Sequence, residues 1–418
     1  MSTILKRMFK SYDYSLLVVY VLLGIFGVVM VYSAGMVYAV EVLDQSADFF
    51  YNAQRRNLIL GFIGFAVMAL IPYKLYREKV MMILILVLMF SLLILVQLFG
   101  ANINNAQSWL QLGSFQLQPS EFAKLGIIVY LSAIYAKKYT YINEFNRGVM
   151  PPLTVLVATC FLVAMEPDFG TAAIIFVIGM SVIISSGMKF KNMLKLAGIG
   201  GALAAFFSLI LFVFKRDGFQ RIFSEERIGR FAAYTDPFAH INDNGWQLVG
   251  SYYAIGNGGL WGSGLGQSVQ KLGYLPEPHT DFIMAIISEE LGIAGVGFVL
   301  LGLAYIVLKG IFIGIKSKDR FGKMLAIGIA SMIGIQAFIN LGGMSGVIPI
   351  TGVPLPFISY GGSSLILLSL AMGLLLNVSM FVKYEDRYAN DKTKEAAEKP
   401  VQFNQTAPNQ HRKANRGY

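Results

Sequence analysis

The chain has 418 residues, of which 56% are hydrophobic and 14% charged, and its formal net charge is +10. An average soluble domain carries about 25% charged residues, so this composition excludes an ordinary soluble enzyme and a disordered chain. The charge-free run 80–99 is about as long as a bilayer-spanning helix, which indicates a membrane protein.

Ten apolar segments predict an all-α, polytopic integral membrane protein. A cytoplasmic N-terminus (1–13) precedes a membrane domain (14–382), which contains a large extracytoplasmic loop (215–280) between spans seven and eight. A polar tail (383–418) is expected to be disordered and cytoplasmic. The expected spans are roughly 14–38, 57–73, 79–100, 121–136, 149–165, 171–187, 192–214, 281–308, 321–342 and 355–382.

The orientation follows from the distribution of lysine and arginine. Of the 34 basic residues, 25 lie in the termini and in the loops on the same side as the termini. Because cytoplasmic loops carry the excess of basic residues, both termini are expected in the cytoplasm. This bias explains the net positive charge without a nucleic-acid partner. The single cysteine and the three widely spaced histidines argue against a metal site built from these residues.

The fourth span opens with the segment 118–124, in which Glu121 and Lys124 share a helix face because they are three residues apart. One interpretation is an acid at a helix start with a self-neutralising partner. The other is a charged wall of a polar cavity, where Lys124 meets an anionic headgroup or a diphosphate.

Two acids occupy the short turn between spans five and six, at Glu166 and Asp168. Asp168 is suited to cap the helix that begins near Thr171. The two carboxylates could equally hold a cation, although this spacing alone is weak support.

The long loop 215–280 carries arginines that could bind phosphate, Arg221 among them, and a glycine-rich run at 256–266. The run lacks the lysine and the preceding strand of a nucleotide-binding loop. It is therefore interpreted as a backbone that turns tightly near the membrane.

Two prolines bring the chain to Asp281 in an extended form, at the outer end of span eight. Thr280 or Asp281 could cap the following helix, or the carboxylate could meet a ligand that enters from the lipid. Glu289 and Glu290 lie two to three turns deeper, and acids at that depth should face a cavity or a partner.

The motifs together resemble the SEDS family (shape, elongation, division, sporulation) over residues 12–385, with features closer to its FtsW than its RodA members. The matching segments are 118–124, 166–171, 276–282, 289–292 and 354–364. Ser108 departs from the pattern, since many relatives carry arginine there. The resemblance implies a peptidoglycan glycosyltransferase that polymerises lipid II for cell division, with Asp281 as the catalytic aspartate.

The resemblance further implies lipid II and the growing glycan strand as ligands, and a class B penicillin-binding protein and other divisome proteins as partners at the division septum. An elongation or sporulation paralogue is the nearest alternative. The candidate substrate-binding residues are Glu121, Lys124, Asp168, Arg221 and Ser363.

The expected chemistry is an inverting transfer, with Asp281 as general base and positive charge beside the leaving diphosphate. Lys124, a loop arginine or a divalent cation (Mg²⁺ or Mn²⁺) could supply that charge, and no nucleotide is needed. A lipid II flippase is the second hypothesis, but the polar motifs gather on one side only. A scaffold that only recruits a partner would leave the charges within the spans unexplained.

Overall fold

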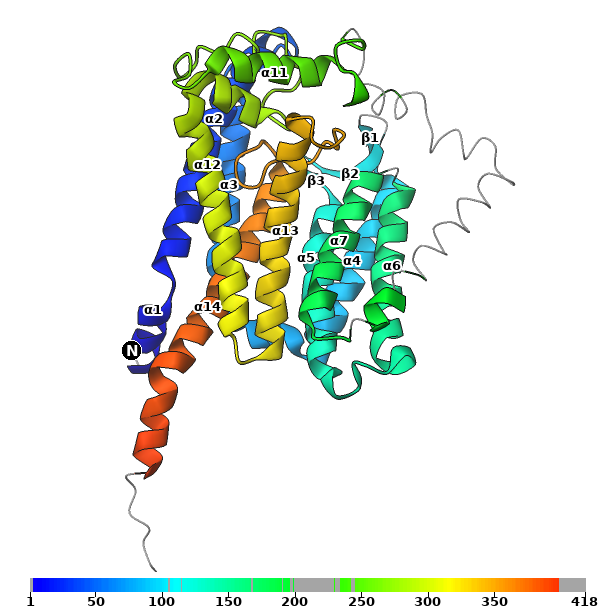
Figure 1. Ribbon diagram of the computed structural model, residues 1–418, viewed down its shortest axis with the longest axis vertical. Coiled ribbons are helices and arrows are strands. Elements are labelled where there is room, and N and C mark those ends of the chain that lie inside the picture. Colours follow the sequence, from blue (N-terminus) through cyan, green and yellow to red (C-terminus); the bar gives the residue numbers. More distant parts are fainter. Residues whose placement is uncertain are drawn as a thin grey trace, which may run out of the picture.

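The computed structural model describes residues 3–103, 106–113, 115–166, 168–189, 191–195, 198, 229, 234–241 and 245–397. Within these ranges the protein is a bundle of long helices with one short helix lying across its top in Figure 1. The helices are α1 (Thr3–Ser11), α2 (Tyr14–Glu41), α3 (Phe49–Leu70), α4 (Lys79–Phe99), α5 (Pro119–Lys137), α6 (Met150–Met165), α7 (Phe169–Ser185), α11 (Trp246–Gly258), α12 (Ile283–Lys316), α13 (Arg320–Met344) and α14 (Gly362–Ala397).

Nine of the ten expected spans coincide with helices among the described residues, and the remaining range, 192–214, lies largely outside them. Six of the described helices are long and apolar enough to cross a membrane. They are α2, α4, α12, α13, the α14 segment to Tyr388, and α6 together with the π-turn Phe145–Val149 that leads into it.

Several boundaries differ from the expected ones. Helix α3 begins at Phe49, two turns before residue 57, and so includes Arg55 and Arg56. Helix α14 begins only at Gly362, because the proline-rich segment before it forms irregular turns. It also continues to Ala397, beyond residue 382, the expected end of the last span.

A small antiparallel sheet precedes α5, an addition to the expected all-α fold. It consists of β1 (Ala101–Ile103), β2 (Ala106–Leu112) and β3 (Phe115–Leu117), in that order. Two short 3₁₀ turns, Tyr73–Arg77 and Tyr139–Tyr141, connect helices elsewhere. The expected loop between spans seven and eight contains helix α11.

The bundle has two distinct ends (Figure 1). The loop end holds α11, the sheet and residues 259–282, whereas the terminal end holds α1 and the last turns of α14. Helix α14 packs on α3, and α12 packs on α13. At the terminal end Arg387 of α14 donates to the carbonyl of Lys10 over 2.9 Å, so the two described chain ends lie together.

Candidate active site

Asp281 lies at the loop end, two residues before α12, and its side chain is partly buried. The N-cap position of α12 is Phe282 rather than Thr280 or Asp281, the two expected candidates. The hydroxyl of Thr280 instead donates to the carbonyl of Glu277 over 2.8 Å. Asp281 therefore sits in the approach to the helix, where its carboxylate does not occupy the cap.

Asn340 of α13 joins the backbone of Asp281 to the backbone of the segment that precedes α14. Its side-chain amide donates to the carbonyl of Asp281 and to that of Val353, each over 2.8 Å. A β-carbon at Gly352 would lie 3.4 Å from Oδ2 of Asp281, and Gly352 has a φ of +74°, which favours glycine. The irregular segment before α14 thus closes against the candidate catalytic carboxylate.

His279 fills the space behind this segment as an apolar ring. It is 3% exposed, its centroid lies 3.8 Å from that of Phe50, and Tyr38 and Tyr360 pack beside it. Burial lowers the pKa of His279 to about 3, so the ring is neutral at physiological pH. It contributes packing near Asp281 rather than a positive charge.

Glu121 and Lys124 form an ion pair of 2.7 Å in the first turns of α5, and both side chains are almost fully buried. The pair confirms the expected shared face. Among the described residues, one carboxylate oxygen of Glu121, Oε2, and the hydroxyl of Ser120 have no hydrogen-bond partner. Buried polar groups are normally hydrogen-bonded, so this pair has unused capacity for a ligand or water.

Asp168 caps α7, because its Oδ1 accepts a hydrogen bond from the backbone of Thr171 over 3.0 Å. Beside it, Glu166 is 1% exposed, and neither of its side-chain oxygens has a hydrogen-bond partner in the part of the chain that the structure describes. Burial, reinforced by the charge of Asp168, raises the pKa of Glu166 to about 8. The structure thus favours the capping interpretation of Asp168 and gives Glu166 the more unusual environment.

This turn approaches the candidate catalytic segment. A β-carbon at Gly170 would lie 3.5 Å from the carbonyl oxygen of Thr351, the residue before Gly352. The structure therefore brings the 166–171 motif next to the loop that covers Asp281.

The two remaining candidate substrate-binding residues are Ser363 and Arg221. Ser363 accepts a hydrogen bond from the backbone of Gln118 (3.1 Å) and donates to the carbonyl of Gln116 (2.7 Å). Its hydroxyl therefore joins the start of α14 to the entrance of α5 and has a structural role in this state. Arg221 lies outside the described residues.

Glu290, which was expected to face a cavity or a partner, binds within the protein. Lys271 pairs with it over 2.7 Å, and both side chains are at most 1% exposed. Ser33 of α2 donates to both of its oxygens over 2.7 and 2.8 Å. This cluster joins α2, the loop and α12 in one contact.

Glu289 accepts hydrogen bonds from the backbones of Val269 (3.1 Å) and Gln270 (3.3 Å) and from the hydroxyl of Ser268. Next to it, Gly292 breaks the regular path of α12 with a φ of +56°, since its backbone touches Leu260. Gly258 and Gly262 of the glycine-rich run pack on the backbone of α12, and the positive φ of Gly259, Gly264 and Gly266 favours glycine at the turns.

The described residues contain no group of three His, Cys, Asp or Glu side chains placed to hold a metal ion. Asn340 and Lys271 are the functional candidates that the sequence analysis missed. A lone asparagine in the apolar segment 321–342 was a usable signal, because polar side chains within spans are costly. Nothing local marked Lys271, whose partner lies 19 residues away.

The chain matches the family described as cell cycle protein (FtsW, RodA, SpoVE) over residues 13–384. It is 51% identical to the "Probable peptidoglycan glycosyltransferase FtsW" of Bacillus subtilis, over 94% of this chain and 95% of the relative. It is 38% identical to the "Stage V sporulation protein E" of Bacillus subtilis, over 90% of this chain and 98% of the relative.

Solved structures show the same fold. The rod shape determining protein RodA of Thermus thermophilus aligns with a TM-score of 0.59 and 23% identity, over 90% of this chain and 98% of that chain. A chain from a structure titled "Structural coordination of polymerization and crosslinking by a peptidoglycan synthase complex" aligns with a TM-score of 0.67 and 24% identity, with the same coverage. The protein is a multi-pass membrane protein and belongs to the SEDS family of FtsW, RodA and SpoVE proteins.

Proposed function

We propose that this protein is a peptidoglycan glycosyltransferase that polymerises lipid II into glycan strands at the outer face of the membrane. The observation that carries the proposal is the partly buried carboxylate of Asp281, whose backbone Asn340 holds, in a chain 51% identical to a protein named as such an enzyme. Family membership supports the same reaction class.

The reaction joins two lipid-linked sugars. The acceptor hydroxyl attacks the anomeric carbon of the donor, and the bond from this carbon to the oxygen of undecaprenyl diphosphate breaks. The hydroxyl proton passes to the carboxylate of Asp281, which acts as general base, and the diphosphate leaves with the bonding electron pair. One displacement converts the α-linked donor into a β-linkage.

The leaving diphosphate requires positive charge. Lys124 is suited to this role because it is a buried cation, whose charge is little screened by water. Arg221 is a further candidate. A divalent cation, Mg²⁺ or Mn²⁺, would need only one or two protein carboxylates, because Mg²⁺ is commonly shared with substrate phosphates and water.

The cell division role, a class B penicillin-binding protein as transpeptidase partner, other divisome partners and the septal location belong to this proposal. So do the cytoplasmic termini, which place Asp281 on the outer face. The positive-inside distribution of charge supports this orientation, since the basic excess lies in the termini and in the loops expected on the same side as the termini.

The test is reconstitution of the purified protein with its penicillin-binding partner, inhibited by a β-lactam, and labelled lipid II. Asp281→Asn should reduce strand synthesis by about 100-fold or more, since a general base contributes about 10²–10⁴-fold. Asp44→Asn, the same substitution in an exposed loop at the same end, should leave the rate within about twofold.

Strand synthesis by Asp281→Asn at the wild-type rate would refute the base assignment. If the wild type makes no strands but moves lipid II across liposome membranes, the protein is a flippase, and Asp281 lines a transport path.

A further inference from the structure

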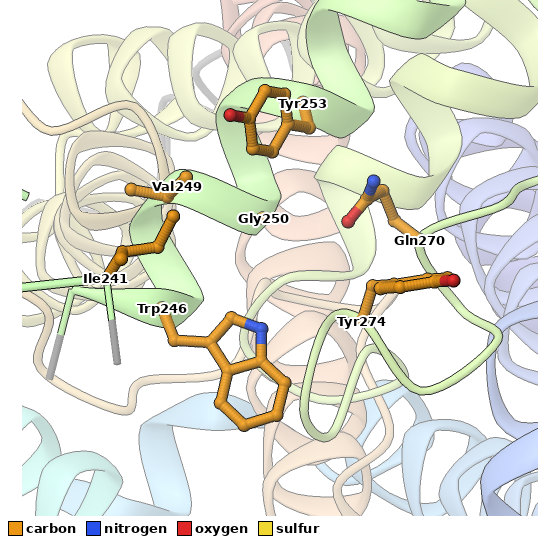
Figure 2. A pocket seen from close by; sticks show the side chains of 7 residues that line it. All are labelled: Ile241, Trp246, Val249, Gly250, Tyr253, Gln270 and Tyr274. Carbon is orange, nitrogen blue, oxygen red and sulfur yellow. The ribbon is translucent and has the colours of Figure 1, made fainter. Parts of the chain in front are cut away.

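A pocket of about 470 Å³ opens at the loop end, between α11 and the turn 269–275 (Figure 2). This volume is within the range of small-molecule sites. Trp246, Val249 and Tyr253 of α11 face Gln270 and Tyr274 across it. The three aromatic side chains keep about half of their surface exposed, at 46%, 52% and 58%.

Both walls of the pocket are held from behind. On one side Ser251 of α11 donates to the carbonyl of Met344 over 3.0 Å. On the other, Glu289 holds the backbone of Gln270, and the Leu275 backbone donates to the carbonyl of Gln270 over 2.8 Å to close the turn. A pocket with fixed walls binds a ligand with a smaller loss of conformational entropy, because its own side chains are already ordered.

Gln270 provides a polar group inside this apolar surface. The residue is 8% exposed, and its side chain lines the pocket. An amide offers both donors and an acceptor, so a ligand with hydroxyl and carbonyl groups would form hydrogen bonds with it.

The lining chemistry narrows the ligand class. None of the described residues that line the pocket is charged, so they offer a diphosphate or another strongly anionic group no counter-charge. Flat aromatic rings, two tyrosine hydroxyls and one amide suit an uncharged molecule with apolar faces and polar edges. N-acetylated sugar rings have this character, because their C–H faces pack on aromatic rings and their hydroxyl and acetamido groups hydrogen-bond.

We propose that this pocket binds the growing N-acetylated glycan strand after it leaves Asp281. The inference rests on the proposed function, since it assigns the pocket to the product of that reaction. The turn that forms one wall continues from Tyr274 through 276–280 directly to Asp281. A bound strand would keep its end near the carboxylate and favour further additions over release.

The competing explanation is an aromatic belt, because Trp and Tyr gather at membrane interfaces without a specific ligand. A belt accounts for the exposed rings but not for the concave shape or for the buried amide of Gln270. Trp261 provides the matched control, since it is 90% exposed on the same loop and does not line the pocket.

The first measurement is binding of chitohexaose, a soluble β-1,4-linked N-acetylglucosamine oligomer, to the full-length protein in nanodiscs, followed by saturation-transfer NMR. Trp246→Ala and Gln270→Ala should each weaken binding about tenfold, as expected for the loss of one stacked ring or of a paired amide. Trp261→Ala and Asp281→Asn should bind within about twofold of wild type.

The second measurement is the strand length made from lipid II. Trp246→Ala should make strands several-fold shorter than Trp261→Ala does when both have consumed the same amount of lipid II. No chitohexaose binding by the wild type, or equal loss in Trp246→Ala and Trp261→Ala, would overturn the inference in favour of a belt. Binding without any strand synthesis by the wild type would instead contradict the proposed function.

Discussion

Two buried lysine–glutamate pairs occur in the described part of the protein, and they differ in how completely they are satisfied. Lys271–Glu290 and Lys124–Glu121 have the same 2.7 Å separation, and no side chain of the four is more than 4% exposed. In the first pair Ser33 donates to both carboxylate oxygens, whereas in the second Oε2 of Glu121 has no partner.

The number of satisfied carboxylate oxygens distinguishes a structural ion pair from a functional one better than the presence of charge alone. A buried ion pair repays its desolvation only when hydrogen bonds satisfy its remaining atoms. The Lys271–Glu290 pair meets this condition and joins three segments of the chain, as a structural contact should. The Lys124–Glu121 pair does not, and a substrate group or water would complete it. We therefore expect the first pair to stabilise the fold, and the second pair stays our proposal for substrate binding.

The largest expected effect is on stability. Lys271→Met leaves Glu290 buried without a cation, which should cost about 3–5 kcal/mol of the free energy of unfolding. Thermal unfolding in detergent would measure the loss. Lys318→Met is the control, because its pair with Asp386 is exposed and spans 3.9 Å, and it should cost less than about 1 kcal/mol.

A second variant tests the cause of that loss. Adding Glu290→Gln to Lys271→Met removes the uncompensated charge while keeping an acceptor for Ser33, so it should recover most of the stability. A double variant as unstable as Lys271→Met alone would mean that lost packing, rather than buried charge, is responsible.

Lys124→Met should have the opposite profile. We expect strand synthesis to fall about 10- to 100-fold, because a charge that stabilises the leaving diphosphate is worth about this much. Glu121→Gln is combined with Lys124→Met so that no uncompensated charge stays buried, and the unfolding cost of this double variant should therefore be smaller than that of Lys271→Met. A variant that is as destabilised as Lys271→Met, yet active per folded molecule, would make this pair structural too.

The sequence alone predicted the Lys124–Glu121 pair but not the Lys271–Glu290 pair. Glu121 and Lys124 are three residues apart on one helix, so local spacing placed them together. Lys271 meets Glu290 and Ser33 through contacts that span 19 and 238 residues, and no periodicity encodes such distances. Asp281 was identified from a motif. The two hydrogen bonds from Asn340 to the carbonyls of Asp281 and Val353, here called the Asn340 clamp, depend on the packing of α13.

The helix bounds were likewise predicted where they depend on local sequence and missed where they depend on other factors. Apolar runs predicted most of them because hydrophobic length is a local property. The start of α3 was missed because Arg55 and Arg56 interrupt the apolar run, although a helix can continue through residues that reach solvent. Residues 355–361 were included in the last span because they are apolar, but their prolines prevent a regular helix.

A third prediction, with an effect of intermediate size on the rate, concerns the hydrogen bonds of Asn340. Asn340→Ala removes two hydrogen bonds to backbone carbonyls and should lower kcat about tenfold, with KM within about threefold, since the carboxylate of Asp281 loses its position. Asn340→Asp keeps the shape but not the donating amide, so it should behave in the same way.

Gln336→Ala is the matched control for this clamp. Gln336 lies one turn earlier on α13, is equally buried, and neither side-chain polar atom has a hydrogen-bond partner. Its loss should therefore leave kcat nearly unchanged. Equal effects at both positions would show that packing of α13, and not the clamp, determines the rate.

The last expected effect depends on pH and concerns Glu166, a buried carboxylate that has no ion-pair partner among the described residues. Its pKa is raised from 4.5 to about 8 by burial, so between these pH values the folded protein binds a proton that the unfolded chain releases. Stability should therefore fall as the pH rises through this window, by at most about 1.4 kcal/mol per pH unit. Glu166→Gln should flatten this slope in thermal unfolding, whereas Glu144→Gln, at an exposed position, controls for the loss of a surface charge. A slope that persists in Glu166→Gln would mean that the carboxylate is ionised in the folded protein and is satisfied, like Glu290, by groups that neutralise it.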